Sequence, residues 1–446
     1  MPSAAEQLAS TINFGAIAKA EELKKRIWFT LGALIIYRLG TYIPLPGIDP
    51  QALAEVFQQN SSGILGMFDV FAGGALGRMT IFALNIMPYI SASIIIQLLS
   101  ATSSHLAQLK KEGESGRRKI TQYTRYGTVV LAALQALGIA SGLEGASSSQ
   151  GPLVTDPGLF FRLSTMITLV GGTVFLMWLG EQITARGIGN GISLIIMAGI
   201  VAELPSALVA TLELGRTGAL SGVLILAFLL LAIAVVAFIV FVERAQRRIL
   251  IQYPKRQVGM KMFGGEASHL PLKINTAGVI PPIFASSILL LPVTALSFNS
   301  GSGPSWLMDV TSLLGRGQPL YMILYVSAIV FFAFFYTSIV FNPEETADNL
   351  KKNGGFVPGV RPGAATASHI EYILTRLTVI GAAYLSAVCL LPELMISRFA
   401  VPFYFGGTSL LIVVSVTMDT VAQVHSHLIA HQYEGLIKKA KLRGRS

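Results

Sequence analysis

Ionisable side chains that could do chemistry inside a membrane are almost absent from this chain. Asp419 alone lies within a long apolar run, and Glu181 and Arg186 fall at the edge of another. Coupled transporters bind ions, protons or substrates with such groups near the middle of the bilayer. Their absence favours a gated pore over an ion-coupled carrier. Because the sequence also contains no Walker motif and no nucleophile constellation, we expect no enzyme and assign the energy source to a partner.

Two further patterns have the residue types of a ligand site but the wrong context. His427 and His431 are one helical turn apart, yet no carboxylate or cysteine joins them at metal-ligand spacing, so an interfacial role is favoured. The glycine-rich run RGIGNGIS (186–193) follows no strand and therefore does not fit nucleotide binding. A helix that begins at a membrane boundary explains its glycines better. We expect no catalytic residue, no metal and no cofactor.

The composition identifies the elements that must build such a pore. Of 446 residues, 52% are hydrophobic and 13% are charged, against about 25% charged in soluble domains. Apolar runs long enough to cross about 30 Å of hydrocarbon recur along the whole chain. The sequence therefore predicts an all-α polytopic membrane protein with ten spans, near 27–43, 79–100, 126–142, 160–180, 188–210, 219–242, 276–297, 319–341, 374–392 and 406–428.

The distribution of charge fixes the expected orientation of these spans. With the N-terminus inside, the inner segments hold 27 of the 33 basic residues, and the outer segments hold six. This asymmetry follows the positive-inside rule and predicts that both termini are cytoplasmic. Residues 1–26 are expected to form an amphipathic arm and residues 429–446 a basic tail. A single cysteine, Cys389, excludes an internal disulfide.

One proline-containing apolar segment occurs twice. NIMPYISASIIIQLL (85–99) and GVIPPIFASSILLLP (278–292) agree at six of fifteen positions, including Pro88 with Pro281. A proline disturbs a helix by about 3 kcal/mol or more, which lipid tolerates only where protein or water meets the freed groups. If 27–215 and 216–428 are related halves, the odd number of spans in each makes them inverted around a central pathway. The alternative is a chance match between isoleucine-rich helices.

Three segments outside the spans stand out. ILGMFDVFAGGALGR (64–78) is too short to span and is broken at Gly73 and Gly74, so it is either a re-entrant plug in the outer mouth or an interfacial loop. Two cytoplasmic loops are long, about 243–275 and 342–375. The first carries seven basic residues with Tyr253 among them. Topology alone accounts for basic loops, but these side chains also suit nucleic-acid phosphates or an acidic protein surface.

Several of these segments together resemble SecY, the family of channel subunits of the bacterial Sec protein-conducting translocon. The most specific stretches are FALNIMPYISASIIIQLL, KKEGESGRRKITQYTRYG, LGEQITARGIGNGIS, FNPEETADNLKKNGGFVPGVRPG and VPFYFGGTSLLI. The resemblance covers essentially the whole chain. It implies ten transmembrane helices in two inverted, pseudo-symmetric halves around an hourglass pore.

The resemblance also implies site residues. An apolar ring at the waist corresponds to Ile86, Ile90, Ile192, Ile196, Ile283 and Ile412. The family plug corresponds to about 64–78, with Ile64, Phe68, Phe71, Gly73, Gly74 and Arg78 as its marked positions. A lateral gate lies between spans two and three on one side and seven and eight on the other. Gln97 and Asn275 could help to hold it closed, although polar groups also simply join helices.

The function implied is passage of unfolded secretory polypeptides through the isoleucine ring, with release of hydrophobic segments into lipid through the gate. The implied partners are SecE-like and SecG-like small membrane subunits, the SecA motor ATPase, the ribosome, and signal peptides with nascent chains, all at the cell inner membrane. SecA or the ribosome would dock on Arg247, Arg248, Lys255, Arg256 and Arg361. The alternative is a secondary transporter of a small solute, which would also use inverted repeats. An intramembrane enzyme would need a buried catalytic group that the sequence does not offer.

Overall fold

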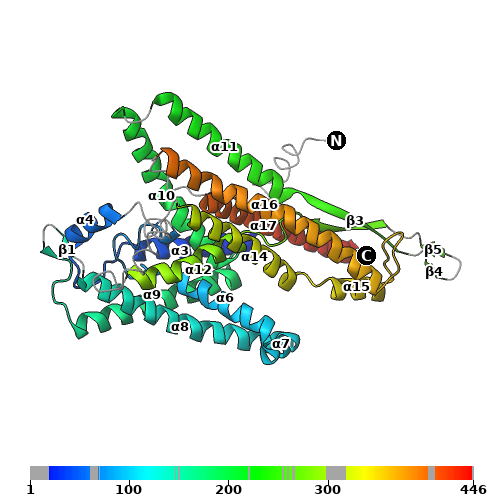
Figure 1. Cartoon of the computed structure of the whole chain (residues 1–446). Helices are drawn as coiled ribbons and strands as arrows, with labels where there is room; N and C mark the ends of the chain where they lie inside the picture. The colour runs from blue at the N-terminus through cyan, green and yellow to red at the C-terminus, as the bar shows by residue number, and fades with distance from the viewer. Residues whose placement is uncertain are drawn as a thin grey trace. The chain divides into compact units, whose positions relative to one another are not determined.

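The structure is a computed structural model, and it divides into two compact units that are described here one at a time (Figure 1). Unit 1 comprises Met1–Val209, Leu290–Ser312 and Ile412–Ser446, and unit 2 comprises Ala210–Leu289 and Leu313–Leu411. Within these limits the structure describes residues 20–60, 69, 71–145, 147–148, 151–218, 221–253, 256–258, 261–263, 267–297, 318–399 and 407–443. Ile64, Phe68 and Lys255 lie outside the described residues.

Each of the ten predicted spans coincides with a helix. Seven described helices are long and apolar enough to cross a membrane, and the pair α6–α7, bent by 101°, is an eighth candidate. The other two predicted spans, 27–43 and 276–297, fall on helices that are less apolar or described over a shorter length. The ten helices are α3 (Glu21–Gly40), α6 (Met87–Thr102), α8 (Glu114–Gly145), α9 (Leu159–Arg186), α10 (Gly191–Arg216), α11 (Gly222–Arg244), α12 (Ile280–Ser297), α14 (Pro319–Val340), α16 (Ala364–Phe399) and α17 (Gly407–Arg443).

The expectation that Pro88 and Pro281 interrupt their helices is wrong. Pro88 lies in the first turn of α6, and Pro281 is the second residue of α12. A proline in the first turn removes no helical hydrogen bond, because the N–H groups there have no intrahelical acceptor. The helix nevertheless starts late, since Thr80 forms an isolated bridge with Pro44 and residues 81–86, expected in the span, form turns instead of helix.

Alanine lines the contact between α8 and α9, the central packing of unit 1. Ala132, Ala136 and Ala140 are four residues apart, lie on one face of α8 and are fully buried. Leu169 of α9 is equally buried in the same cluster. Small side chains allow two helices to approach closely, which compensates for the missing hydrophobic driving force in lipid.

Two ion pairs tie α8 and α9 together, one near each end of α9. Arg125 Nη2 lies 2.6 Å from Glu181 Oε2, and the Arg125 Nε also donates to this carboxylate. At the other end, Arg162 Nη2 lies 2.6 Å from Glu144 Oε2, and the pair lowers the pKa of Glu144. Helix α6 packs along α8, next to α7 (Ser104–Lys111), as Figure 1 shows. Helices α6, α8 and α9 therefore form one packed layer.

The glycine-rich run that opens α10 is a helix start, as the sequence predicts. Asn190 Oδ1 accepts from the backbone N–H of Ile192 at 3.1 Å. The Gly189 N–H donates to Gln423 of α17 at 2.9 Å, and the Ile188 N–H donates to Thr30 of α3 at 3.1 Å. The run thus connects three helices of unit 1 through its own backbone donors.

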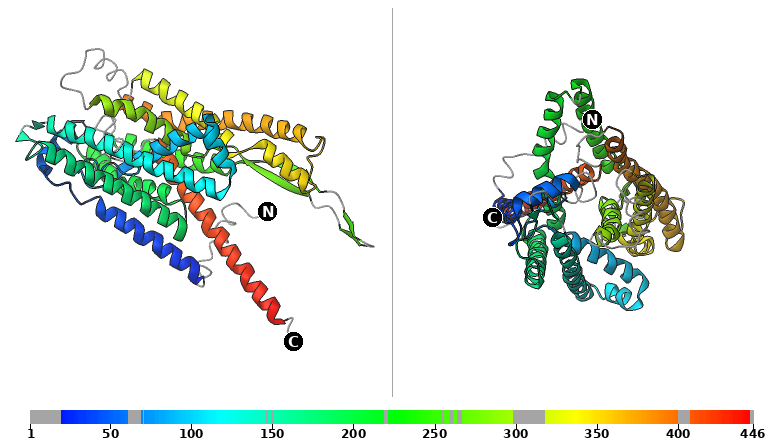
Figure 2. Two further views of the ribbon diagram at one scale, coloured as in Figure 1. Left: turned by 90° about the horizontal axis from the view of Figure 1, so that it is seen from below. Right: turned by 60° about the vertical axis from the view of Figure 1, so that its left-hand side comes forward.

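Unit 2 contains strands that the sequence analysis did not predict. The loop expected over 243–275 includes an antiparallel hairpin of β3 (Gln246–Gln252) and β6 (Ala267–Lys273), with Gln246 opposite Lys273. Two shorter strands, β4 (Arg256–Val258) and β5 (Lys261–Phe263), pair with each other beyond it. Figures 1 and 2 show this hairpin extending past α15, with β4 and β5 at its tip. The described part of the fold is therefore helical in its spans and β-stranded in this segment between α11 and α12.

The second long loop also has regular structure. Helix α15 (Pro343–Lys352) begins after Asn342, whose side chain accepts from the N–H groups of Glu344 and Glu345. Acidic residues in its first turn and lysines in its last turn complement the helix dipole. Helix α16 starts at Ala364, ten residues before the predicted span. It ends at Phe399, so it extends beyond the expected membrane segment at both of its ends.

Enlarging Ala136 should separate α8 from α9. We expect Ala136→Leu to lower the free energy of unfolding by about 1–3 kcal/mol, because a fully buried site cannot accept three more carbons without strain. Thermal unfolding of the purified protein in lipid nanodiscs measures this change. The matched control is Val130→Leu on the same helix, where the side chain is 59% exposed. Equal stability of the two variants would contradict a close α8–α9 contact.

Candidate functional site

The six isoleucines of the expected ring share one feature, their position in the first two turns of a helix or directly before it. Ile86 is the N-cap of α6, and Ile90 lies one turn further along. Ile192 and Ile196 occupy the first two turns of α10. Ile283 lies in the first turn of α12, and Ile412 lies in the second turn of α17.

Most of these isoleucines are buried. Ile86 and Ile412 are 1% exposed, and Ile90 and Ile196 are 6% exposed. Ile192 and Ile283 are half-buried. Five of the six belong to unit 1, whereas Ile283 belongs to unit 2, so their closure into one ring stays a prediction.

The described part of the expected plug, from Phe71 to Arg78, is a compact series of turns in unit 1. Phe71 is buried, and Gly73 and Gly74 have φ angles of +65° and +78°. A side chain at Gly73 would place its Cβ 2.9 Å from the Cα of Gly199 in α10. Glycine is needed at this position both for its backbone conformation and for the close approach to α10.

Three side chains donate hydrogen bonds to consecutive carbonyl groups of this segment. Asn85 Nδ2 donates to the Phe71 carbonyl at 2.6 Å, and Tyr37 Oη donates to the Ala72 carbonyl at 3.3 Å. Arg38 Nη1 donates to the Gly73 carbonyl at 3.0 Å. These bonds supply partners for backbone that no regular element satisfies. Sequence analysis did not assign a role to Tyr37, Arg38 or Asn85; the asparagine that begins the apolar segment NIMPYISASIIIQLL was the available signal.

Charged groups close the other end of the segment. Arg78 Nη2 lies 3.5 Å from Glu203 Oε1, and its guanidinium lies 4.4 Å from the centroid of the Tyr42 ring. Asp69 Oδ1 accepts from the Gly77 N–H at 2.7 Å, and burial raises the pKa of the Asp69 carboxyl. Because Arg78 and Glu203 are partly exposed, their ion pair contributes about 1 kcal/mol or less. The carbonyl contacts are therefore the larger part of the attachment.

The two residues expected at the lateral gate have local partners. Gln97 Nε2 of α6 donates to Ser93 Oγ at 3.3 Å, and its Oε1 is buried without a hydrogen-bond partner among the described residues. Asn275 is 4% exposed and donates to Glu243 Oε1 at 2.7 Å and to the Gly278 carbonyl at 3.1 Å. Asn275 thus joins the end of α11 to the turn before α12. A role of either residue in a gate stays a prediction.

The expected docking residues belong to two long loops that the fold joins within unit 2. Gln252 and Phe356 exchange backbone hydrogen bonds at 2.9 and 3.0 Å, which joins the strand β3 to the turn after α15. Arg247 and Arg248 are exposed on β3, Arg256 is in β4, and Arg361 is exposed in the turn before α16. The two loops, 104 positions apart at that pairing, are therefore joined through their backbones, and sequence spacing gives no signal of this pairing.

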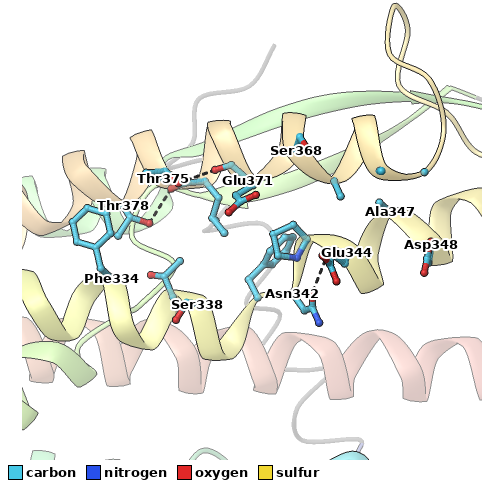
Figure 3. A pocket seen from close by; sticks show the side chains of 17 residues that line it. Phe334, Ser338, Asn342, Glu344, Ala347, Asp348, Ser368, Glu371, Thr375 and Thr378 are labelled. Carbon is cyan, nitrogen blue, oxygen red and sulfur yellow. Dashed lines mark hydrogen bonds between the residues drawn. The ribbon is translucent and has the colours of Figure 1, made fainter. Parts of the chain in front are cut away.

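A cavity of about 600 Å³ lies elsewhere in unit 2, between α14, α15 and α16 (Figure 3). Phe334 and Thr378 line one end, and Glu344 and Asp348 line the other, with Glu371 between them. None of the site residues expected from the sequence lines this cavity. It is separate from the pore, plug and docking predictions.

Comparison with known proteins adds a family match. The SecY family model matches residues 80–421. The chain is 58% identical over 424 residues to the protein translocase subunit SecY of Escherichia coli (strain K12), covering 95% of this chain and 96% of the relative. The matched region includes the α6, α10, α12 and α17 positions of the expected ring.

Solved structures give the fold independently. The chain is similar to a protein-conducting channel, with a TM-score of 0.63 at 18% identity over 90% of this chain and 92% of that one. It is similar, with a TM-score of 0.62 at 19% identity and the same coverage, to a SecY channel whose plug domain stabilises the closed state and maintains a membrane seal. Sec61 in a canine ribosome–channel complex from the endoplasmic reticulum gives 0.61 at 18% identity, again over 90% and 92%. These similarities agree with the predicted ten-helix architecture.

A side chain at Gly73 should loosen the segment from Phe71 to Arg78. We expect Gly73→Ala to raise amide hydrogen exchange in this segment about tenfold, equivalent to about 1.4 kcal/mol, because the added Cβ meets α10. Gly113→Ala is the matched control, since Gly113 has a similar φ of +77° but no neighbouring atom within 4 Å of the added Cβ. If Gly73→Ala leaves exchange at wild-type rates, the contact with α10 does not hold the segment.

Proposed function

The chain belongs to the SecY family of protein translocase subunits, and from this premise we propose which of its residues seal, open and dock the channel. It is a multi-pass membrane protein and a protein-conducting channel, with the family's plug, rather than an enzyme. This membership decides against the alternative of a small-solute transporter.

The seal is formed by the isoleucines that begin α6, α10, α12 and α17. An aliphatic constriction excludes ions by dewetting and carries no fixed charge that would grip a passing chain. The single observation that best supports it is the shared position of all six residues at helix starts, with four of them at most 6% exposed. The segment 64–78 is the plug that covers this seal on the outer side.

The lateral gate sorts segments by partition. Each central Leu, Ile or Phe gains about 0.3–0.6 kcal/mol in lipid, whereas a central Lys, Arg or Asp costs about 2.5–3.5 kcal/mol. Ten leucines therefore favour exit by about 3–6 kcal/mol, and one charge cancels much of that gain. Sorting needs no catalytic group. Gln97 on α6 and Asn275 before α12 are polar groups that favour the closed gate.

The partners supply the energy and the polypeptide. We assign a SecE-like and a SecG-like subunit, the SecA motor and the ribosome to this chain, at the cell inner membrane with both termini in the cytoplasm. The ribosome-bound Sec61 relative supports the ribosome assignment. Arg247, Arg248 and Arg361 lie exposed on two joined loops of one unit, which suits docking of an anionic partner. Lys255 and Arg256, which belong to the same predicted loop in the sequence, complete this docking set.

Removing the seal should make the closed channel leak. We expect replacement of Ile86, Ile90, Ile192 and Ile283 by glycine to raise the ion conductance of reconstituted vesicles at least tenfold, because a wider polar constriction stays wet. Four glycines at isoleucines with half or more of the side chain exposed control for lost helix stability, namely at Ile35, Ile36, Ile167 and Ile233. A ring variant as tight as this control set would remove the seal from the proposal.

Reversing one charge should separate docking from channel integrity. We expect Arg361→Glu to reduce motor-driven export of a secretory protein into vesicles at least tenfold, while the variant inserts and unfolds like the wild type. Arg118→Glu, at another exposed cytoplasmic arginine, is the matched control and should export normally. Normal export by Arg361→Glu would exclude this loop from motor docking.

A further inference from the structure

Asn85 combines two features that destabilise the folded chain. Its φ is +48°, a left-handed conformation that non-glycine residues rarely adopt. Its side chain is 3% exposed, and its Oδ1 has no hydrogen-bond partner among the described residues. Backbone strain and an unsatisfied buried acceptor persist only where the surroundings enforce them, and such sites cluster in switch regions.

The benefit of Asn85 is its one buried hydrogen bond. Its Nδ2 donates to the carbonyl of Phe71, fourteen residues earlier, at 2.6 Å. The next residue, Ile86, is the N-cap of α6, the helix that carries Ile90 and Gln97. A single side chain thus links the plug segment to the first turn of a helix that we assign to both the ring and the lateral gate.

The residue type fits this link closely. Gly adopts the left-handed conformation freely, and Asn and Asp adopt it more readily than the other residue types, although still at a cost. Of these three, asparagine alone has a side-chain N–H that can donate to a carbonyl at neutral pH. Aspartate would face the Phe71 carbonyl with a second acceptor, and glycine would leave the carbonyl without this donor.

The origin of the bond distinguishes Asn85 from the other two donors to the segment. Tyr37 and Arg38, which donate to the Ala72 and Gly73 carbonyls, both lie in α3. Among the described side chains that bond these three carbonyls, Asn85 is the one that precedes α6 directly. Movement of α6 would therefore stretch the Asn85 bond and leave the α3 bonds unaffected.

We propose that Asn85 is a positioning residue that couples the plug to the gate helix, so that displacement of α6 withdraws the donor from Phe71 and releases the plug. The inference rests on the proposed assignments of 64–78 as plug and α6 as gate helix. The unsatisfied Oδ1 makes the link easy to break. In the closed state this acceptor has no hydrogen-bond partner among the described residues, and it can gain one when the two segments separate.

The test compares two ways of loosening the same segment. In the purified channel complex in lipid nanodiscs, amide exchange of residues 71–78 is measured before and after addition of a synthetic signal peptide, a hydrophobic stretch with a basic N-terminus. Asn85→Gly keeps the backbone conformation and removes both the donor and the unsatisfied oxygen. Tyr37→Phe removes one α3 bond and is the matched control. Thermal unfolding confirms that both variants are folded.

We expect the peptide to raise exchange in the wild-type segment at least tenfold. Tyr37→Phe should start higher and still respond, whereas Asn85→Gly should start higher and respond less than twofold. Asn85→Asp should behave like Asn85→Gly, because it retains the shape but not the donor. A full response in Asn85→Gly would overturn the coupling alone. A wild-type segment that does not respond to the peptide would overturn the plug assignment itself, and with it the coupling.

Discussion

Backbone hydrogen bonding away from water is the constraint on which this structure depends. Helices satisfy their own N–H and C=O groups, but the turns from Phe71 to Ile86 must find partners elsewhere in the protein. They find them in neighbouring backbone, as where the Leu45 N–H donates to Met79 and the Ile81 N–H donates to Ile43, and in side chains of α3 and Asn85. The irregular segment is thus held by a few directional bonds instead of a ladder, and fewer bonds must break for it to move than for a helix.

The rest of unit 1 is built to resist such movement. Helices α8 and α9 pack through an alanine stripe and are tied by an ion pair near each end of α9, and α6 lies against α8. If α6 moves as a gate helix, it must therefore either move together with α8 or slide along α8. In either case, the first turn of α6 joins the packed helix to the hydrogen-bonded turns before it. The proposed ring, gate and plug all include residues at or next to this turn.

Some features of the fold and the site could be predicted from the sequence and others could not, for physical reasons. The apolar runs and the charge asymmetry predicted all ten helices, because both patterns reflect transfer between water and lipid, which each residue reports locally. The start of α6 was predicted eight residues too early, since the turns over 81–86 are as apolar as a helix. The β3–β6 hairpin was missed because its pairing depends on partners about twenty residues away, and the pairing of Gln252 with Phe356 depends on a partner in another loop.

By itself the sequence determined the class of protein. The charge asymmetry predicted its orientation, and the motif resemblance predicted which isoleucines form the ring. The tertiary structure alone decided that prolines 88 and 281 begin helices, that glycine at 73 faces α10, and that Tyr37, Arg38 and Asn85 converge on three successive carbonyls. Transfer free energy is a property of single residues and can be summed along a chain. A hydrogen bond requires two groups within about 3 Å, and only the folded backbone brings residues 37, 71 and 85 that close.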